Sequence, residues 1–213
     1  MNAWHFLPNS GRTQYSEELV SNEWLHSEGP LKLCRNGMHA STRIIDALQY
    51  APGSIVCRVE LGGKLLRGTD KVCAEKRRVL WRVDAERLLH EFACRCAEDV
   101  LTPASDPVFH AAIAAKRAWL RGEISAEDLH AARDAAKYAA GHAAGHAAGH
   151  AAKYAAGHAA WYAAEYEAST AAEYEASTAA YYAVRTRQNK RLVEMVKAAR
   201  KKEQKACTQR ETK

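Results

Sequence analysis

The chain has 213 residues, of which 47% are hydrophobic, and a formal net charge of +6. No run of 18 apolar residues occurs, and the N-terminus has no basic segment followed by an apolar one, which argues against a membrane-spanning or secreted protein. We therefore expect a cytoplasmic protein. Much of the apolar content is alanine, which buries little area, so the residues able to form a core lie mostly before Leu120.

The first segment, residues 1–103, has the pattern of a small α+β head domain. Five stretches alternate or are rich in β-branched residues, as strands are: residues 3–7, 31–34, 54–61, 64–67 and 78–83. Two stretches predict helices, 43–50 with Ser41 or Thr42 as its cap and 85–101 with Asp84 as its cap. Turns are predicted at Asn36-Gly37 and Gly62-Gly63. We expect a small, mostly antiparallel sheet with packed helices, followed by a long alanine-rich helical tail.

The segments after the head differ in composition. Residues 104–135 predict a helical connector of two helices, one beginning at Asp106-Pro107 and one at Ser125, which has a carboxylate in the capping-box position. Residues 136–184 are an alanine-rich tetrapeptide repeat, and one octapeptide occurs twice in succession at 163–170 and 171–178. Alanine favours helix, and the four-residue period makes any side-chain stripe circle that helix. The repeat therefore predicts a helix without a fixed apolar face.

The positive charge lies at the C-terminal end, residues 185–213, which carries 11 Lys or Arg against 3 Glu. Clustered cations neutralise phosphates, so this basic helix or tail is a candidate nucleic-acid contact. The candidate cations are Arg185, Arg187, Lys190, Arg191, Lys197, Arg200, Lys201 and Lys202.

Two groups of residues have ligand types that bind metal ions. His142, His146 and His150 are spaced at i, i+4 in the repeat and predict adventitious metal affinity. His90, Cys94 and Cys96 share a predicted helix, but a structural zinc site needs four ligands and these cysteines point to different sides. The six cysteines are irregularly spaced, so we expect free thiols.

Residues 33–41, 46–53 and 59–63, together with Asp70-Lys71, resemble a family from tailed phages and bacteria. Its members carry a Leu-Cys-x-x-Gly-x-His segment, a short helix, a strand and an Asp-Lys loop, and many have alanine-rich repetitive tails. The resemblance spans residues 2–135. It implies a phage-type accessory protein in the bacterial host cytoplasm, and it implies no activity because the family's function is unknown.

His39 is the first candidate for chemistry in the head, because it follows the predicted Asn-Gly turn. The run Gly-x-His-x-Ser resembles the start of the NAD site in ADP-ribosyltransferases, which implies an aromatic residue and a catalytic glutamate, and Tyr50 and Glu60 are the candidates. A nucleophile, Cys34 or Ser41, acting with His39 is a weaker alternative. A histidine hydrogen-bonded within the turn is the structural alternative.

We interpret the chain as a non-enzymatic binding module with a helical tail that serves as spacer or oligomerisation element. The expected partner is an unidentified protein, and a homo-oligomer through the alanine-rich helix is compatible with the sequence. Two alternatives stay open: an ADP-ribosyltransferase-like enzyme using His39, and a nucleic-acid-binding protein using the basic C-terminus. No cofactor motif is found, and no membrane partner is expected.

Overall fold

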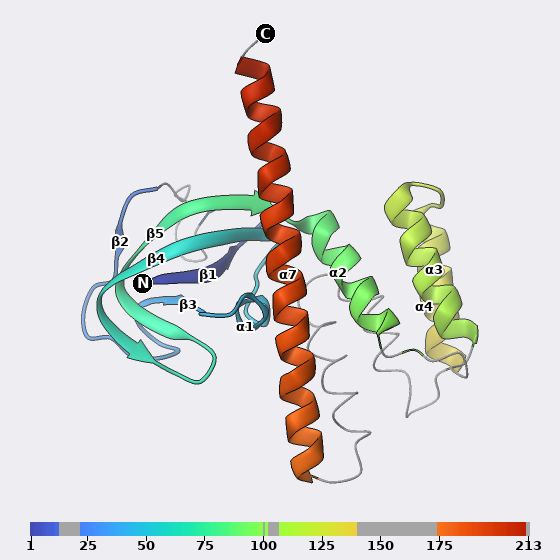
Figure 1. Ribbon diagram of the computed structural model, residues 1–213, viewed down its shortest axis with the longest axis horizontal. Helices are drawn as coiled ribbons and strands as arrows, with labels where there is room; N and C mark the ends of the chain where they lie inside the picture. The colour runs from blue at the N-terminus through green and yellow to red at the C-terminus, as the bar shows by residue number, and fades with distance from the viewer. Residues whose placement is uncertain (13–21, 100, 102–106, 140–173, 212–213) are drawn as a thin grey trace. The chain divides into compact units, whose positions relative to one another are not determined.

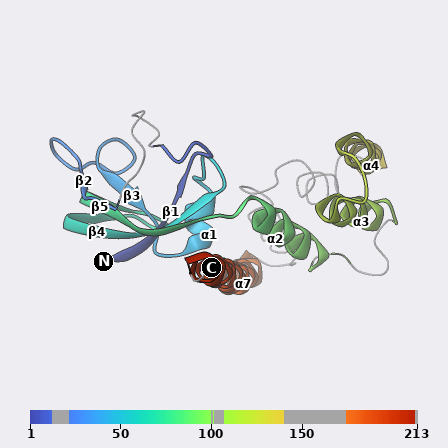
Figure 2. The same ribbon diagram turned by 90° about the horizontal axis from the view of Figure 1, so that it is seen from above.

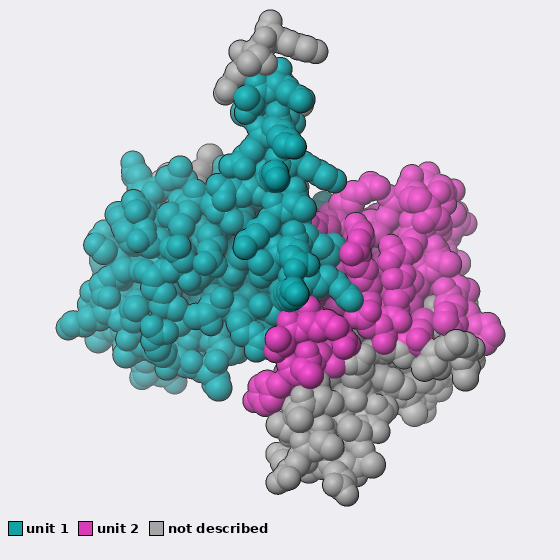
Figure 3. All heavy atoms as spheres, viewed as in Figure 1, with its two compact units in different colours: residues 1–86, 189–213 teal, residues 87–188 magenta. Residues whose placement is uncertain are grey.

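The computed structural model describes residues 1–12, 22–99, 101, 107–139 and 174–211 (Figure 1). The chain divides into two compact units, Met1–Glu86 with Asn189–Lys213 as unit 1 and Arg87–Gln188 as unit 2 (Figure 3). None of the helices in the described ranges is long and apolar enough to cross a membrane.

Unit 1 contains five strands and a short helix. The strands are β1 (Asn2–Leu7), β2 (Leu25–His26), β3 (Met38–Ala40), β4 (Ile55–Arg67) and β5 (Val72–Asp84). All their pairings are antiparallel, in the order β1-β4-β5-β2, and β3 also pairs with β5. With the short helix α1 (Ile44–Leu48), this confirms the predicted α+β class.

The chain that leaves β3 returns to the first strand. Trp4 and Ser41 exchange backbone hydrogen bonds of 2.7 and 2.9 Å, so β1 is bonded to β4 on one side and bridged to the end of β3 on the other. The enclosed core contains Ala3, Leu7, Ala40, Cys57, Val59, Leu61, Val72, Ala74 and Val79. This ring of hydrogen bonds fixes where β1 and β3 stand relative to each other.

Three local predictions were wrong. The two strands predicted at 54–61 and 64–67 are one 13-residue strand, β4, which begins at Ile55, because a register shift between Gly62 and Leu65 absorbs the glycines. The hairpin loop comes later, between Arg67 and Val72. Residues 31–34 form a turn, because the Lys32 carbonyl accepts from the N–H groups of Arg35 and Asn36. The residue before α1 is Arg43, whose side chain makes no capping hydrogen bond.

The two faces of the sheet can be assigned from its register. Directly paired residues share a face, so His5, Cys57 and their alternating neighbours lie on one face, which we call the pocket face: Ala3, His5, Leu7, Ile55, Cys57, Val59, Leu61, Arg77, Val79, Arg82 and Asp84. The opposite, helix face carries Trp4, Phe6, Val56, Arg58, Glu60, Arg78, Trp81 and Val83. Leu80 has no partner between Val59–Val79 and Arg58–Trp81, so the alternation along β5 changes phase there.

The end of helix α7 (Tyr174–Glu211) that belongs to unit 1 covers the helix face (Figures 1 and 2). Leu192 and Val196 are fully buried, and the Arg200 guanidinium lies 4.3 Å from the centre of the Trp81 ring. The Asn189 side-chain oxygen accepts a hydrogen bond of 3.3 Å from the Ile45 N–H. The compact units thus divide the chain differently from the predicted segments, because apolar residues within the basic end pack onto the head.

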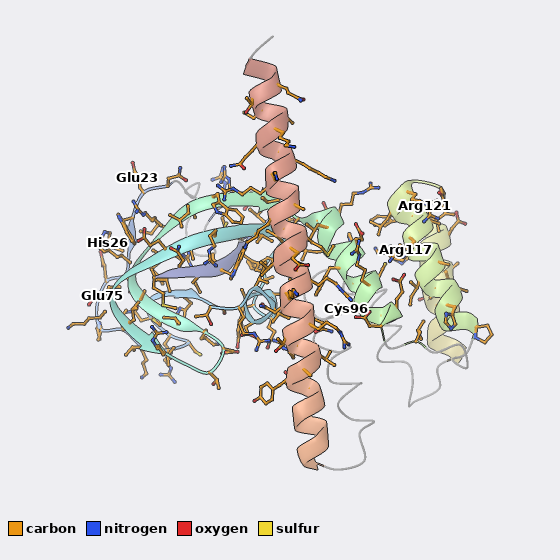
Figure 4. All side chains as sticks on the ribbon, viewed as in Figure 1. Glu23, His26, Glu75, Cys96, Arg117 and Arg121 are labelled. Carbon is orange, nitrogen blue, oxygen red and sulfur yellow. The ribbon has the colours of Figure 1, made fainter. Side chains whose placement is uncertain are left out.

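Unit 2 contains α3 (Pro107–Arg121), α4 (Ala126–Ala139) and most of α2 (Glu86–Glu98). Apolar residues of α2 and α3 form one cluster: Ala93, Cys94, Ala97, Ile113 and Leu120. Arg117 of α3 binds Glu98 of α2 with two hydrogen bonds, one of them 2.7 Å (Figure 4).

Of the helix caps predicted for this part of the chain, those at Asp84 and Ser125 are confirmed, whereas the third, Asp106, lies outside the described residues. Asp84 accepts from the Glu86 N–H at 3.0 Å, which is the expected start of α2. Ser125 and Asp128 bond to each other's backbone N–H at 3.1 Å, the reciprocal pattern of a capping box.

Candidate ligand-binding pocket

Unit 1 contains a pocket of about 790 Å³, a volume typical of small-molecule sites. Its walls come from β1, β2, β3, β5, α1 and the loop before β5, and its residues span Trp4 to Arg77. The sheet supplies its rigid side, and the segment 34–39 closes another side. Figure 4 marks His26, a wall residue on β2, beside Glu75 at the same end of the sheet.

Two neighbouring arginines of β5 have opposite surroundings. Arg78 is on the helix face, where its guanidinium pairs with the Glu60 carboxylate at 2.6 Å. Arg77 is on the pocket face, lines the pocket and is only 7% exposed. Its Nη1 donates a 2.6 Å hydrogen bond to the His39 carbonyl, and its Nε has no partner.

Burial alters the acid–base behaviour of the pocket side chains. Desolvation lowers the pKa of Arg77 to about 10, so the guanidinium is still charged at neutral pH. Burial also holds the pKa of His5 well below its usual value, and the charges of Arg77 and His39 add to this effect. His5 is therefore a neutral ring beside a buried cation.

His39 is held within the turn by its ring. Its Nε2 accepts a 3.1 Å hydrogen bond from the Cys34 N–H, so that nitrogen carries no proton. Burial lowers the pKa of His39, and a hydrogen bond with the Gly37 backbone partly opposes the shift. The ring thereby links the two ends of the segment 34–39.

The glycine of this segment is required by its contacts. Gly37 has φ 123°, and a Cβ at this position would lie 2.1 Å from the Cys73 sulfur and 2.9 Å from the Leu31 side chain. Cys73 in turn donates its S–H to the Asn36 carbonyl at 3.1 Å. The Cys, Gly and His of the Leu-Cys-x-x-Gly-x-His segment thus have structural roles in building one wall of the pocket.

Tyr50, Asp70 and Lys71 form a cluster at the pocket edge. The Tyr50 hydroxyl donates a short hydrogen bond to Asp70, and the Lys71 ammonium lies 3.8 Å from the centre of the Tyr50 ring. Tyr50 and Lys71 both line the pocket, and Tyr50 is 52% exposed. The Asp-Lys loop is therefore tied to the end of the short helix.

The structure does not bring the three ADP-ribosyltransferase candidates together. His39 and Tyr50 line the pocket, but Glu60 is on the helix face, paired with Arg78. The nucleophile candidates also differ, since Cys34 is exposed at φ 63° and Ser41 is buried at the bridge to Trp4.

The C-terminal candidate cations fall into two groups. Four lysines are exposed on α7: Lys190, Lys197, Lys201 and Lys202. The four arginines have protein contacts, because Arg185 is buried, Arg187 pairs with Asp99 at 3.8 Å, Arg191 is half-buried with a partner and Arg200 covers Trp81.

The two groups of metal candidates lie in different parts of the chain. His142, His146 and His150 lie outside the described residues. Within the described part of the chain no three His, Cys, Asp or Glu side chains gather as a metal site, and the His90 ring instead packs edge-on to Trp119 at 5.2 Å.

Sequence reasoning missed Arg77 and His5. A simple alternation through 77–83 places Arg77 on one face with Val79, Trp81 and Val83, and the unpaired Leu80 breaks that pattern. The available signal was His5, a polar residue alternating with Ala3 and Leu7 in an otherwise apolar strand.

Residues 9–91 match the model of a protein family described as a domain of unknown function (DUF7666). This range contains α1, β2 to β5 and most of the pocket wall. No curated protein and no solved structure matches the chain.

Proposed function

We propose that the head is a binding module whose pocket takes a small molecule. The observation that carries this is the pocket of about 790 Å³, whose wall is held by hydrogen bonds between residues 34–39 and by the bridge from β3 to β1. Because this wall is already ordered, little conformational entropy is lost when a ligand binds, which favours affinity.

Binding is better supported than catalysis at this site. The Nε2 of His39 already accepts a hydrogen bond from the Cys34 N–H, so this nitrogen serves the wall of the pocket and not a reacting group. Glu60 is paired on the opposite face of the sheet. The phage-type character of the protein is a separate proposal, based on the resemblance of residues 2–135, and the tail as spacer or oligomerisation element is also a proposal.

Thermal denaturation of the full chain with a library of neutral and charged small molecules tests the proposal. Leu25→Trp narrows the pocket, and Leu80→Trp makes the same substitution at an exposed position outside it. We expect hits that stabilise the wild type and Leu80→Trp but not Leu25→Trp. Hits that stabilise all three proteins equally, or no hits at all, would contradict a small-molecule pocket.

A further inference from the structure

Arg77 is a buried cation without a carboxylate. It is 7% exposed, and its Nη1 donates to a neutral acceptor, the His39 carbonyl. Among the described residues no Asp or Glu forms an ion pair with it, whereas Arg78 beside it has Glu60. Because burial of an uncompensated charge is costly, a protein retains one where a ligand or partner supplies the opposite charge.

The rest of the pocket wall is also basic. Lys71 and Arg35 line it, and none of its described lining residues is an Asp or Glu, although Asp70 lies beside Lys71 at the pocket edge. The pocket therefore carries a positive potential in a partly desolvated space, where an anion is favoured.

His5 adds a neutral polar group to the same wall. Its ring lines the pocket near Arg77, and no described residue forms a hydrogen bond with it. A neutral imidazole can donate one N–H, so His5 can supply a second contact to an acceptor bound at Arg77.

The size and walls of the pocket point to more than a bare ion. The volume of about 790 Å³ is far larger than one oxyanion needs, and Leu25, Met38 and Pro52 give it apolar surface. Guanidinium groups match the geometry of carboxylate and phosphate oxygens.

We infer that the pocket binds a small organic oxyanion, a phosphate monoester or a carboxylate, with Arg77 holding the anionic group and the apolar wall holding the organic part. This inference rests on the proposed function of the pocket. It assigns Arg77 as a ligand contact and Arg78 as a structural residue.

Titration calorimetry of the full chain with phenyl phosphate, benzoate and the neutral benzyl alcohol tests the inference. We expect at least one of the two anions to bind the wild type at least tenfold more tightly than benzyl alcohol. Arg77→Met should weaken that anion at least tenfold, Arg77→Lys should weaken it less, and the matched control Arg78→Met should change its affinity less than twofold. Inorganic phosphate should compete with the anion.

The outcomes separate this inference from the proposed function. If benzyl alcohol binds as well as the anions, and Leu25→Trp abolishes binding while Arg77→Met does not, the pocket is a ligand site but the oxyanion assignment is wrong. If no probe binds, or if binding is unaffected by both Leu25→Trp and Arg77→Met, both are wrong. If Arg77→Met is unfolded by circular dichroism, the charge-preserving Arg77→Lys is compared with Arg78→Lys. Weaker anion binding in Arg77→Lys alone supports the assignment. The same loss of anion selectivity in both variants overturns it.

Discussion

The arginine side chains on the two faces of the head sheet have different kinds of partner. On the helix face, Arg78 pairs with Glu60, and the guanidinium groups of Arg58 and Arg200 lie 4.7 and 4.3 Å from the ring centres of Trp4 and Trp81. On the pocket face, Arg77 is buried and donates a hydrogen bond to the His39 carbonyl. The arginines of the helix face therefore have an acidic or aromatic partner within the protein, whereas for Arg77 the proposed ligand would supply that partner.

The largest effect should come from breaking the wall of the pocket. Gly37→Ala combines a positive φ with a clash against Cys73, so we expect a loss of about 4 kcal/mol in the free energy of unfolding. Gly122 also has a positive φ, 77°, but nothing lies within 4 Å of an added Cβ, so Gly122→Ala should cost about 1 kcal/mol. Urea unfolding measures both, and equal losses would show that the Cys73 contact is unimportant.

The helix face should depend on α7 almost as strongly. Leu192→Ala removes a fully buried side chain and should lower the free energy of unfolding by about 3 kcal/mol. Glu194→Ala, at an exposed position of the same helix, is the control and should change it by less than about 0.5 kcal/mol. A near-zero effect of Leu192→Ala in urea unfolding would mean that α7 does not cover the sheet.

Replacing the neighbouring arginines by methionine should change the free energy of unfolding of the ligand-free protein in opposite directions. Arg77→Met removes a desolvated charge at the expense of one hydrogen bond, so we expect the free energy of unfolding to rise by about 1 kcal/mol. Arg78→Met breaks a partly exposed ion pair and should lower it by about 0.5 kcal/mol. If Arg77→Met lowered the free energy of unfolding by more than about 2 kcal/mol, Arg77 would be a structural residue, and the two faces would not differ in the role of their arginines.

The smallest effect should be a pH dependence from His5. Its pKa in the folded protein is below that of the unfolded chain, so the unfolded chain takes up the proton first, and stability falls as pH falls below the ordinary histidine value of about 6.5. The charges nearest the ring, Arg77 and His39, both act in this direction. His5→Phe should flatten the fall in melting temperature between pH 6.5 and 5, and an unchanged slope would contradict it.

The sequence predicted the class of the fold better than its details. Alternation and caps identified β1, the first half of β4, α2 and the start of α4, because local chemistry decides these elements. The long continuation of β4 through Gly62-Gly63 depends on pairing with β5, which no local pattern records. A helix was predicted at the basic C-terminal end, but its packing onto the head was not, because Leu192 and Val196 are isolated apolar residues within a basic segment.

The site was predicted only in part. The predicted Asn-Gly turn pointed to His39, and the resemblance to ADP-ribosyltransferases pointed to Tyr50; both residues line the pocket. The central residue, Arg77, was missed because its burial arises from the phase change at Leu80 and from long-range contact with β3. Burial of a charge is a tertiary property, so one strand's sequence could not reveal it.

A crystal structure of the full chain with phenyl phosphate would test the central claim most directly. The account predicts phosphate oxygens within hydrogen-bonding distance of the Arg77 guanidinium, with the ring against Leu25, Met38 or Pro52. Phenyl phosphate bound at the exposed lysines of α7, with Arg77 unoccupied, would contradict it.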